Sequence, residues 1–123
     1  MSADPYSARV RTLFEHPAHA GSLEQGRQVL IEDQGVRIAL AALAQDGRIR
    51  VLRFRAYGCP HVVAAAEALC ERLEGRPVAD LETFEAAQLV RELPVPAEKT
   101  GRILVIEDAA RALGKTLRGN SGS

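Results

Sequence analysis

The sequence has no tryptophan, only two tyrosines and three phenylalanines, and no excess of either charge. Its sixteen basic and sixteen acidic residues cancel, so electrostatics gives no reason to expect binding to nucleic acid or to anionic lipid. So few aromatic side chains also argue against a base-stacking platform for single-stranded nucleic acid. We therefore do not expect nucleic acid as a partner.

Long apolar runs are absent as well. No apolar stretch approaches the ~20 residues of a membrane-spanning helix, and the first residues lack the apolar core of a secretory signal. We therefore expect no membrane partner and a cytoplasmic location, where thiols stay reduced. The only cysteines are Cys59 and Cys70. On a single helix they would lie about 16 Å apart, which is too far for a disulfide.

What is present is an ordinary globular mixture. The 123 residues are 46% hydrophobic and 26% charged, which is enough for one domain with its own core. We place this domain over residues 1–118. Residues 119–123, Gly-Asn-Ser-Gly-Ser, are predicted to form a disordered tail.

The hydrophobic periodicity indicates an α+β fold: a small antiparallel three-stranded sheet packed by four to five helices. A short amphipathic helix is predicted first, with Asp4-Pro5 as its N-cap and first helical position. Residues 27–31 can form a short strand, and apolar residues alternate over 36–42. Asp46-Gly47 favours a type I′ turn into a strand over 49–57. A β-hairpin is therefore expected.

Three helices are predicted in the second half. The first follows Gly58-Cys59-Pro60, with Gly75 placed to end it. The second uses Asp80 or Thr83 as its N-cap. The third carries an apolar stripe over residues 103–117.

Cys59 is the side chain that most strongly suggests chemistry. It lies where a strand ends and a helix begins, with Pro60 at the first helical position. There the free N–H groups and the helix dipole lower a thiol pKa and favour thiolate, the form that binds metal or attacks sulfur. His61 is a candidate second metal ligand or proton partner. The alternative is that Cys59 only fills a tight turn.

Other polar side chains are predicted to have structural roles. Cys70, in mid-helix, is expected to act as a small core residue. His16 and His19 form H-x-x-H, but Pro17 prevents the helix that would place both imidazoles on one face, so turn and capping roles are expected. Adjacent carboxylates such as Glu107-Asp108 point about 100° apart on a helix, and usually one is simply solvated. Positive charge gathers on the predicted hairpin, as a solvated strand face or a partner-docking surface, at Arg48, Arg50, Arg53 and Arg55.

The chain carries no phosphate-binding loop, dinucleotide fingerprint, zincin motif, nucleophile elbow or C-x-x-C pair. We therefore do not expect an enzyme. A small enzyme that uses Cys59 as nucleophile and His61 as base remains an option, but no oxyanion site or substrate pocket is evident.

A series of short motifs runs in order from about Tyr6 to Leu113. They are Tyr6-Ser7-x-x-Val10, His16-Pro17-x-His19-x-Gly21-Ser22, Asp46-Gly47-x-Ile49, Arg53-Phe54-Arg55-Ala56-Tyr57-Gly58-Cys59, Ala64-Ala65-Ala66, Glu74-Gly75-Arg76-Pro77-Val78, Glu92-Leu93-Pro94 and Ile106-Glu107-Asp108-Ala109. Their order and spacing resemble the U-type iron–sulfur cluster assembly scaffolds, which comprise the NifU N-terminal domain and IscU-like proteins. The resemblance implies the U-type scaffold fold over nearly the whole chain.

In that family three cysteines and one aspartate hold a [2Fe–2S] cluster or zinc, and only the middle cysteine is present here, as Cys59. Gln34-Gly35-Val36 corresponds to the motif with the first cysteine and the aspartate. Lys99-Thr100-Gly101-Arg102 occupies the loop of the third cysteine. One thiolate per chain cannot hold a cluster tightly. The resemblance therefore implies weak binding of iron or a [2Fe–2S] cluster, with zinc as another candidate, through Cys59 with His61 or across a dimer.

Two functions follow from the resemblance. The first is a scaffold-like protein of iron–sulfur cluster assembly, in which Cys59 accepts persulfide sulfur or binds iron or a cluster weakly. The alternative is a non-catalytic binding module that keeps the scaffold's docking surface and regulates a cysteine desulfurase or a co-chaperone. The sequence leaves the oligomeric state and the roles of His16 and His19 open.

Overall fold

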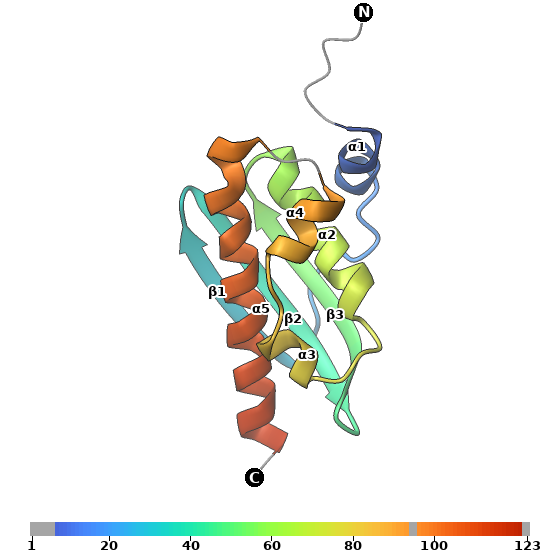
Figure 1. Cartoon of the computed structure of the whole chain (residues 1–123). Helices are drawn as coiled ribbons and strands as arrows, with labels where there is room; N and C mark the ends of the chain where they lie inside the picture. The colour runs from blue at the N-terminus through green and yellow to red at the C-terminus, as the bar shows by residue number, and fades with distance from the viewer. Residues whose placement is uncertain (1–6, 94–95, 122–123) are drawn as a thin grey trace, which may run out of the picture.

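A small sheet with helices on one face organises the molecule (Figure 1). The computed structural model describes residues 7–93 and 96–121. In these residues the elements are α1 (Ala8–Glu15), β1 (Arg27–Asp33), β2 (Val36–Gln45), β3 (Arg48–Tyr57), α2 (Pro60–Leu73), α3 (Ala79–Glu82), α4 (Ala87–Glu92), the 3₁₀-helix η1 (Ala97–Lys99) and α5 (Thr100–Ser121). The strands pair antiparallel in the order β1-β2-β3. The predicted α+β fold is confirmed.

Two short turns with positive φ connect the strands. Asp46 and Gly47 have φ of 55° and 76°, as a type I′ turn requires, so the predicted hairpin is confirmed. Gln34 and Gly35 also have positive φ, of 54° and 74°, and form the turn between β1 and β2. The sequence did not signal this second turn because glutamine is uncommon at positive φ.

The core lies between one face of the sheet and the two long helices. Ile38, Leu40 and Ala42 of β2 are fully buried, and their partners on β3 are Ala56, Phe54 and Leu52. Directly paired residues share a face of the sheet, so this face is a continuous apolar layer. The layer packs against α2 and α5 in a single hydrophobic cluster, while α1 packs on α2 and α3 packs on α5.

The helix predicted to begin at Asp80 or Thr83 is two short helices, so this prediction is wrong. Helix α3 ends at Glu82, with Thr83 as its C-cap, and α4 begins after Ala86. The N-cap positions are Val78 and Ala86, and neither contributes a side-chain capping hydrogen bond.

Tertiary contacts explain the break between α3 and α4. The carbonyl of Phe84 accepts a hydrogen bond from Arg111 Nε at 2.9 Å, and the backbone N–H of Ala86 donates to Glu107 Oε1 at 2.8 Å. Both partners belong to α5. The connecting segment therefore forms hydrogen bonds with α5 in place of helical ones, and Phe84 itself is buried.

The helices at the two ends of the chain also differ from the sequence expectations. Ser7 is the N-cap of α1 and its Oγ accepts from the backbone N–H of Val10 at 3.1 Å; the predicted cap at Asp4-Pro5 lies outside the described residues. Helix α5 continues through Ser121 and so includes the first three residues of the predicted tail, because glycine inside a helix is tolerated at a modest cost. Residues 122 and 123 lie outside the described parts. No helix in the described chain has the length and apolar character needed to cross a membrane.

Gly47→Ala is expected to lower the free energy of unfolding by about 1 kcal/mol, because a residue with a Cβ is strained at positive φ. Gly119→Ala is the matched control: it lies in α5, and an added Cβ would meet nothing within 4 Å. The control should be neutral or slightly stabilising. Urea denaturation of both variants tests the turn; an equal effect of the two substitutions would contradict it.

Candidate functional site

Three segments that are distant in sequence meet around Cys59. The β1–β2 turn, the β3–α2 junction and the start of α5 lie at the same end of the molecule, at the top in Figure 1. Cys59 is the N-cap of α2, in extended conformation, and Pro60 is the first helical residue, so the predicted strand-to-helix junction is confirmed. Its thiol is free and half-buried, whereas Cys70 is free and fully buried in the core.

The surroundings of the Cys59 thiol favour thiolate. Partial burial opposes ionisation, but the backbone N–H groups of Val62 and His61, the Arg102 side chain and the charge of Lys99 outweigh it and lower the pKa of Cys59. The N–H groups belong to the free start of α2. The two cations come from the end of η1 and the first turn of α5. The fold thus brings two distant positive charges to one thiol.

Sequence reasoning missed the roles of Lys99 and Arg102. It identified residues 99–102 only as the segment where histidine and cysteine are missing. An added Cβ on Gly101 would lie 3.9 Å from Gln34 Oε1, so the β1–β2 turn approaches the first turn of α5. The β1–β2 turn, the β3–α2 junction and the start of α5 therefore converge, and they supply an amide, one thiol and two cations.

His61 lies beside this site and beneath the surface. Its side chain is 1% exposed, in the first turn of α2. Burial, and then the charge of Lys99, lower its pKa, so the imidazole is neutral at neutral pH. Because Lys99 acts on both Cys59 and His61, all three side chains belong to one neighbourhood.

The donor set at this site is small. Among the described residues, no three histidine, cysteine, aspartate or glutamate side chains gather where they could hold a metal ion. Cys59 and His61 offer two donors at most, and the positive charges of Lys99 and Arg102 oppose the approach of a cation. The arrangement suits a thiolate that reacts with a sulfur donor better than a closed metal cage, which needs about four protein ligands.

A second polar cluster fastens the segment of residues 16–21 to α2. His19 Nδ1 lies 2.7 Å from Glu67 Oε2, and its Nε2 lies 3.1 Å from Glu74 Oε1. The backbone N–H of His19 also donates to Glu67 Oε1 at 2.8 Å. Burial opposes a charge on the ring, but the two carboxylates outweigh it and raise the pKa of His19. Protonated His19 can donate from both ring nitrogens.

The same cluster covers the edge of β3. Glu74 Oε2 accepts from the backbone N–H of Leu52 at 2.9 Å and from Arg53 Nη1 at 2.8 Å. The backbone N–H of Phe54 donates to the carbonyl of His19 at 3.0 Å. Residues 16–21 therefore serve as a partial fourth strand beside β3.

The sequence predicted turn and capping roles for His16 and His19; this holds for His16, whereas His19 has a different role. His19 bridges two carboxylates, and His16 is the exposed C-cap residue of α1. Sequence reasoning missed Glu67, which is fully buried. The available signal was a lone acidic residue on the alanine-rich stripe of a buried helix, since a buried carboxylate needs a partner.

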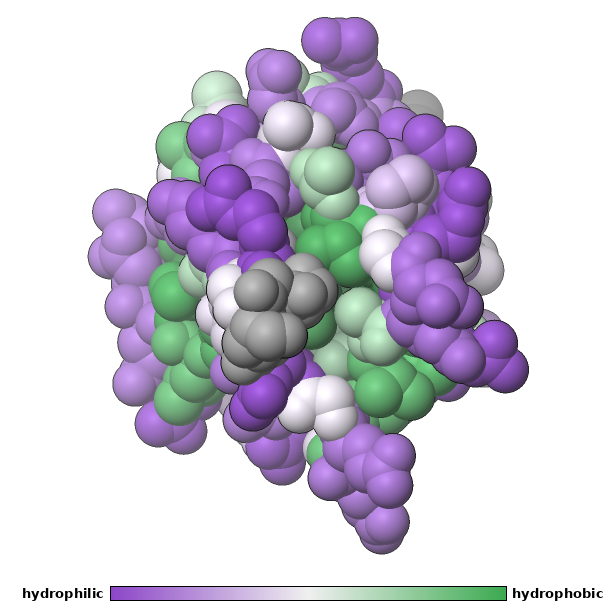
Figure 2. Space-filling model, turned by 90° about the horizontal axis from the view of Figure 1, so that it is seen from below, coloured by the Kyte–Doolittle hydropathy of each residue, from purple (hydrophilic) through white to green (hydrophobic). Residues whose placement is uncertain are grey.

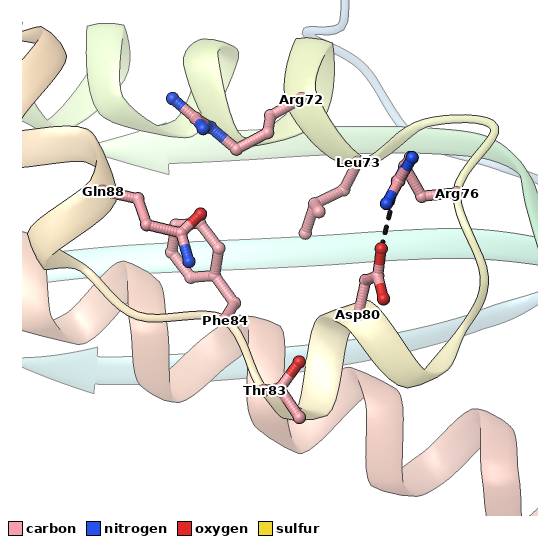
Figure 3. A pocket seen from close by; sticks show the side chains of 7 residues that line it. All are labelled: Arg72, Leu73, Arg76, Asp80, Thr83, Phe84 and Gln88. Atoms are coloured by element: carbon pink, nitrogen blue, oxygen red, sulfur yellow. Dashed lines mark hydrogen bonds and ion pairs between the residues drawn. The ribbon is translucent and has the colours of Figure 1, made fainter.

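A separate cavity of about 340 Å³ lies between the end of α2 and helices α3 and α4. Figure 3 shows Arg76 facing Asp80 on one side of it and Arg72 on the other. Arg76 Nε donates to Asp80 at 3.0 Å and Arg72 donates to Glu92 at 2.7 Å, so each guanidinium has a carboxylate partner.

Figure 2 shows mostly hydrophilic residues, with apolar ones in smaller areas, on the end that carries the β2–β3 turn. Neither the cavity nor this surface contributes a side chain to the Cys59 site.

Lys99→Gln and Arg102→Gln are each expected to raise the pKa of Cys59 and slow its alkylation by iodoacetamide at neutral pH severalfold, because each removes a cation that favours thiolate. Lys115→Gln is the matched control, since Lys115 is an exposed lysine further along α5. The pH dependence of the alkylation rate gives the pKa. Unchanged thiol pKa values in both variants would refute the electrostatic account.

Stability should fall as pH rises through the pKa of His19. The folded pKa is raised above the unfolded value of 6.5, so the contribution of His19 to the free energy of unfolding is complete below pH 6.5 and is lost above it. His19→Gln should lower the free energy of unfolding by roughly 2–3 kcal/mol near pH 6. It should also make the free energy of unfolding less dependent on pH. Urea titrations from about pH 6 to about pH 8 measure it, with His16→Gln as control; a variant as pH-dependent as wild type would argue against this role.

Comparison with known proteins places this geometry in a family. The model of the NifU-like N-terminal domain matches residues 5–119. The chain is 26% identical over 128 residues to the iron–sulfur cluster assembly scaffold protein IscU of Azotobacter vinelandii, covering 95% of this chain and 97% of the relative. It is 25% identical to the IscU of Escherichia coli, over 87% of this chain and 89% of that one.

Solved structures show the same fold. The N-terminal NifU-like protein from Brucella abortus superimposes with a TM-score of 0.74 over 92% of this chain and 94% of that chain, at 12% identity. A putative scaffold protein for the SUF system from Fervidobacterium islandicum gives a TM-score of 0.60 at 16% identity, over 85% of this chain and 81% of that one. The resemblance drawn from the sequence motifs is thereby confirmed, and the chain belongs to the NifU-like N-terminal domain family.

Proposed function

We propose that this chain is a scaffold-like protein of iron–sulfur cluster assembly whose Cys59 accepts sulfur as a persulfide. One observation carries the proposal: Cys59 is a half-buried thiol of lowered pKa at the start of α2, beside Arg102 and Lys99. The assignment to iron–sulfur cluster assembly is supported by the relatives, which are named as scaffold proteins of that process.

The chemical step is a thiol exchange. The Cys59 thiolate attacks the outer sulfur of a donor persulfide, R–S–SH. A bond forms between Cys59 Sγ and that sulfur while the donor S–S bond breaks, and the donor leaves as the thiolate R–S⁻. Charge and electrons balance without an oxidant. Lys99 and Arg102 stabilise the attacking thiolate and oppose its protonation.

The donor of this sulfur is a cysteine desulfurase in our proposal, with a co-chaperone as a further partner. The chain receives and passes on sulfur, so we propose no enzymatic activity of its own, and we propose that it acts in the cytoplasm. Iron or a [2Fe–2S] cluster is cargo. With Cys59 and His61 as the only thiol and imidazole here, such cargo is held weakly, and zinc would meet the same two donors.

A second candidate function rests on the face of the sheet opposite the helices, called the outer face here. Leu30 and Tyr57 are 55% and 63% exposed on it. They line a hollow of about 220 Å³ together with Gln28, Arg37, Ala39 and Arg55. Exposed apolar and arginine side chains in a shallow hollow are typical of protein-binding surfaces. This favours a binding module that regulates a cysteine desulfurase or a co-chaperone without using Cys59.

Incubation with a cysteine desulfurase and free cysteine is expected to add one sulfur atom to Cys59, as seen by mass spectrometry of the intact protein. Cys59→Ser should abolish the addition. Cys70→Ser is the matched control and should retain it, because Cys70 is fully buried. Anaerobic incubation with iron and sulfide should give little stable chromophore.

The same proteins separate the two functions. If Cys59→Ser still binds the desulfurase, Tyr57→Asp abolishes that binding, and wild-type Cys59 gains no sulfur, the chain is a binding module. A Cys59-dependent chromophore with stoichiometric iron and sulfide would instead show stable cluster binding and would overturn the weak-cargo part of the proposal.

A further inference from the structure

The two edges of the sheet differ. On the β3 side, Ala20 bridges to Phe54 and Pro77 bridges to Arg48. On the other side, β1 pairs only with β2 among the described residues, and Figure 1 shows no described segment beyond it. Within residues 7–93 and 96–121, the backbone N–H and C=O groups on this edge of β1 have no partner strand, and such groups are a template for another strand.

The side chains of β1 are also incompletely covered. Val29 and Ile31 pair with Leu40 and Ile38 on the core face, yet they are only half-buried. Leu30 points to the outer face and is 55% exposed. Apolar surface thus remains on both faces of this edge, next to the open backbone.

The sequence of β1 is complementary to itself in the antiparallel direction. Read as Arg-Gln-Val-Leu-Ile-Glu-Asp over residues 27–33, it has Leu30 at its centre. Pairing with a second copy about Leu30 sets Arg27 opposite Asp33 of that copy and Gln28 opposite Glu32. Val29 then meets Ile31, and Leu30 meets Leu30 of the second copy. Paired residues share a face, so the basic end meets the acidic end, the amide of Gln28 meets a carboxylate, and apolar meets apolar at the centre.

Charge also selects the direction. A parallel, in-register pair would set Arg27 against Arg27 and Asp33 against Asp33, and directly opposed like charges destabilise a sheet. Only the antiparallel arrangement sets opposite charges against each other at both ends of the strand. We propose that β1 is a homodimer interface, in which two copies join their sheets across a two-fold axis at Leu30.

This dimer has a definite shape. The axis is perpendicular to the sheet, because directly opposed residues keep their faces, so both helical layers lie on one side. β1 ends at the β1–β2 turn, next to the Cys59 end of its own copy. The two β1 strands run in opposite directions, so the two Cys59 sites lie at opposite ends and each stays open. The proposal is independent of the sulfur-transfer function.

The opposite reading is that the charged ends of β1 only protect an edge from pairing, as charges on edge strands do in many proteins. The protective reading predicts a monomer at all concentrations. The pairing reading predicts a dimer whose stability depends on the sign of the charge at position 27 relative to position 33.

Sedimentation velocity of the full chain over a range of concentrations tests the proposal. The wild type should shift from monomer to dimer. Arg27→Asp should weaken the dimer about tenfold or more, since two attractive pairs become repulsive. The double variant Arg27→Asp/Asp33→Arg should restore it. Arg50→Asp, an equal charge change at an exposed position on β3, is the control and should leave the dimer unchanged.

A covalent trap gives a second readout. Leu30→Cys, in a Cys59→Ser background, should oxidise to a disulfide-linked dimer, whereas Leu104→Cys, at a comparably exposed position on α5, should not. Circular dichroism verifies folding of every variant, because Asp33 also accepts a hydrogen bond from the backbone N–H of Gln34. A monomer at every concentration overturns the proposal, and so does a dimer that Arg27→Asp leaves intact.

Discussion

The chemistry at Cys59 depends on one packing constraint, which is that α2 and α5 bury their apolar stripes on the same face of one sheet. Both helices begin at the same end of that sheet. The start of α2 supplies free N–H groups to the thiol, and the start of α5 supplies Arg102. Both helices therefore contribute to the lowered pKa of Cys59, so the reactive group is a property of the packing as much as of the cysteine.

The contact between His19 and Glu67 of α2 helps to close one edge of the sheet. Glu67 is fully buried on α2, and a buried carboxylate is costly unless it is paired. His19 provides that partner and brings the segment of residues 16–21 against β3. The edge of β3 is thereby covered, and β1 is left as the open edge. The segment held by this contact therefore leaves β1 as the edge at which a second chain can extend the sheet in the proposed dimer.

Local signals were readable from the sequence and tertiary ones were not. Asp46-Gly47 identified its turn because the requirement for positive φ is satisfied by the dipeptide itself. The break between α3 and α4 was missed because Arg111 and Glu107 of α5 create it. Cys59 was found from its place between a strand and a helix. Its cations were missed because Lys99 lies forty residues away in the chain, and no local pattern links the two.

The residues around Cys59 decide what its single thiolate can do. A cluster needs several thiolates around iron, and among the described residues no three possible metal ligands gather at one place. A persulfide needs one thiolate only, and the nearby cations favour it by stabilising negative charge on sulfur. Lys99 and Arg102 therefore assist persulfide formation, whereas the small number of ligands limits cluster binding. A NifU-like fold with one thiolate of lowered pKa at this site is in this way consistent with the sulfur transfer proposed above.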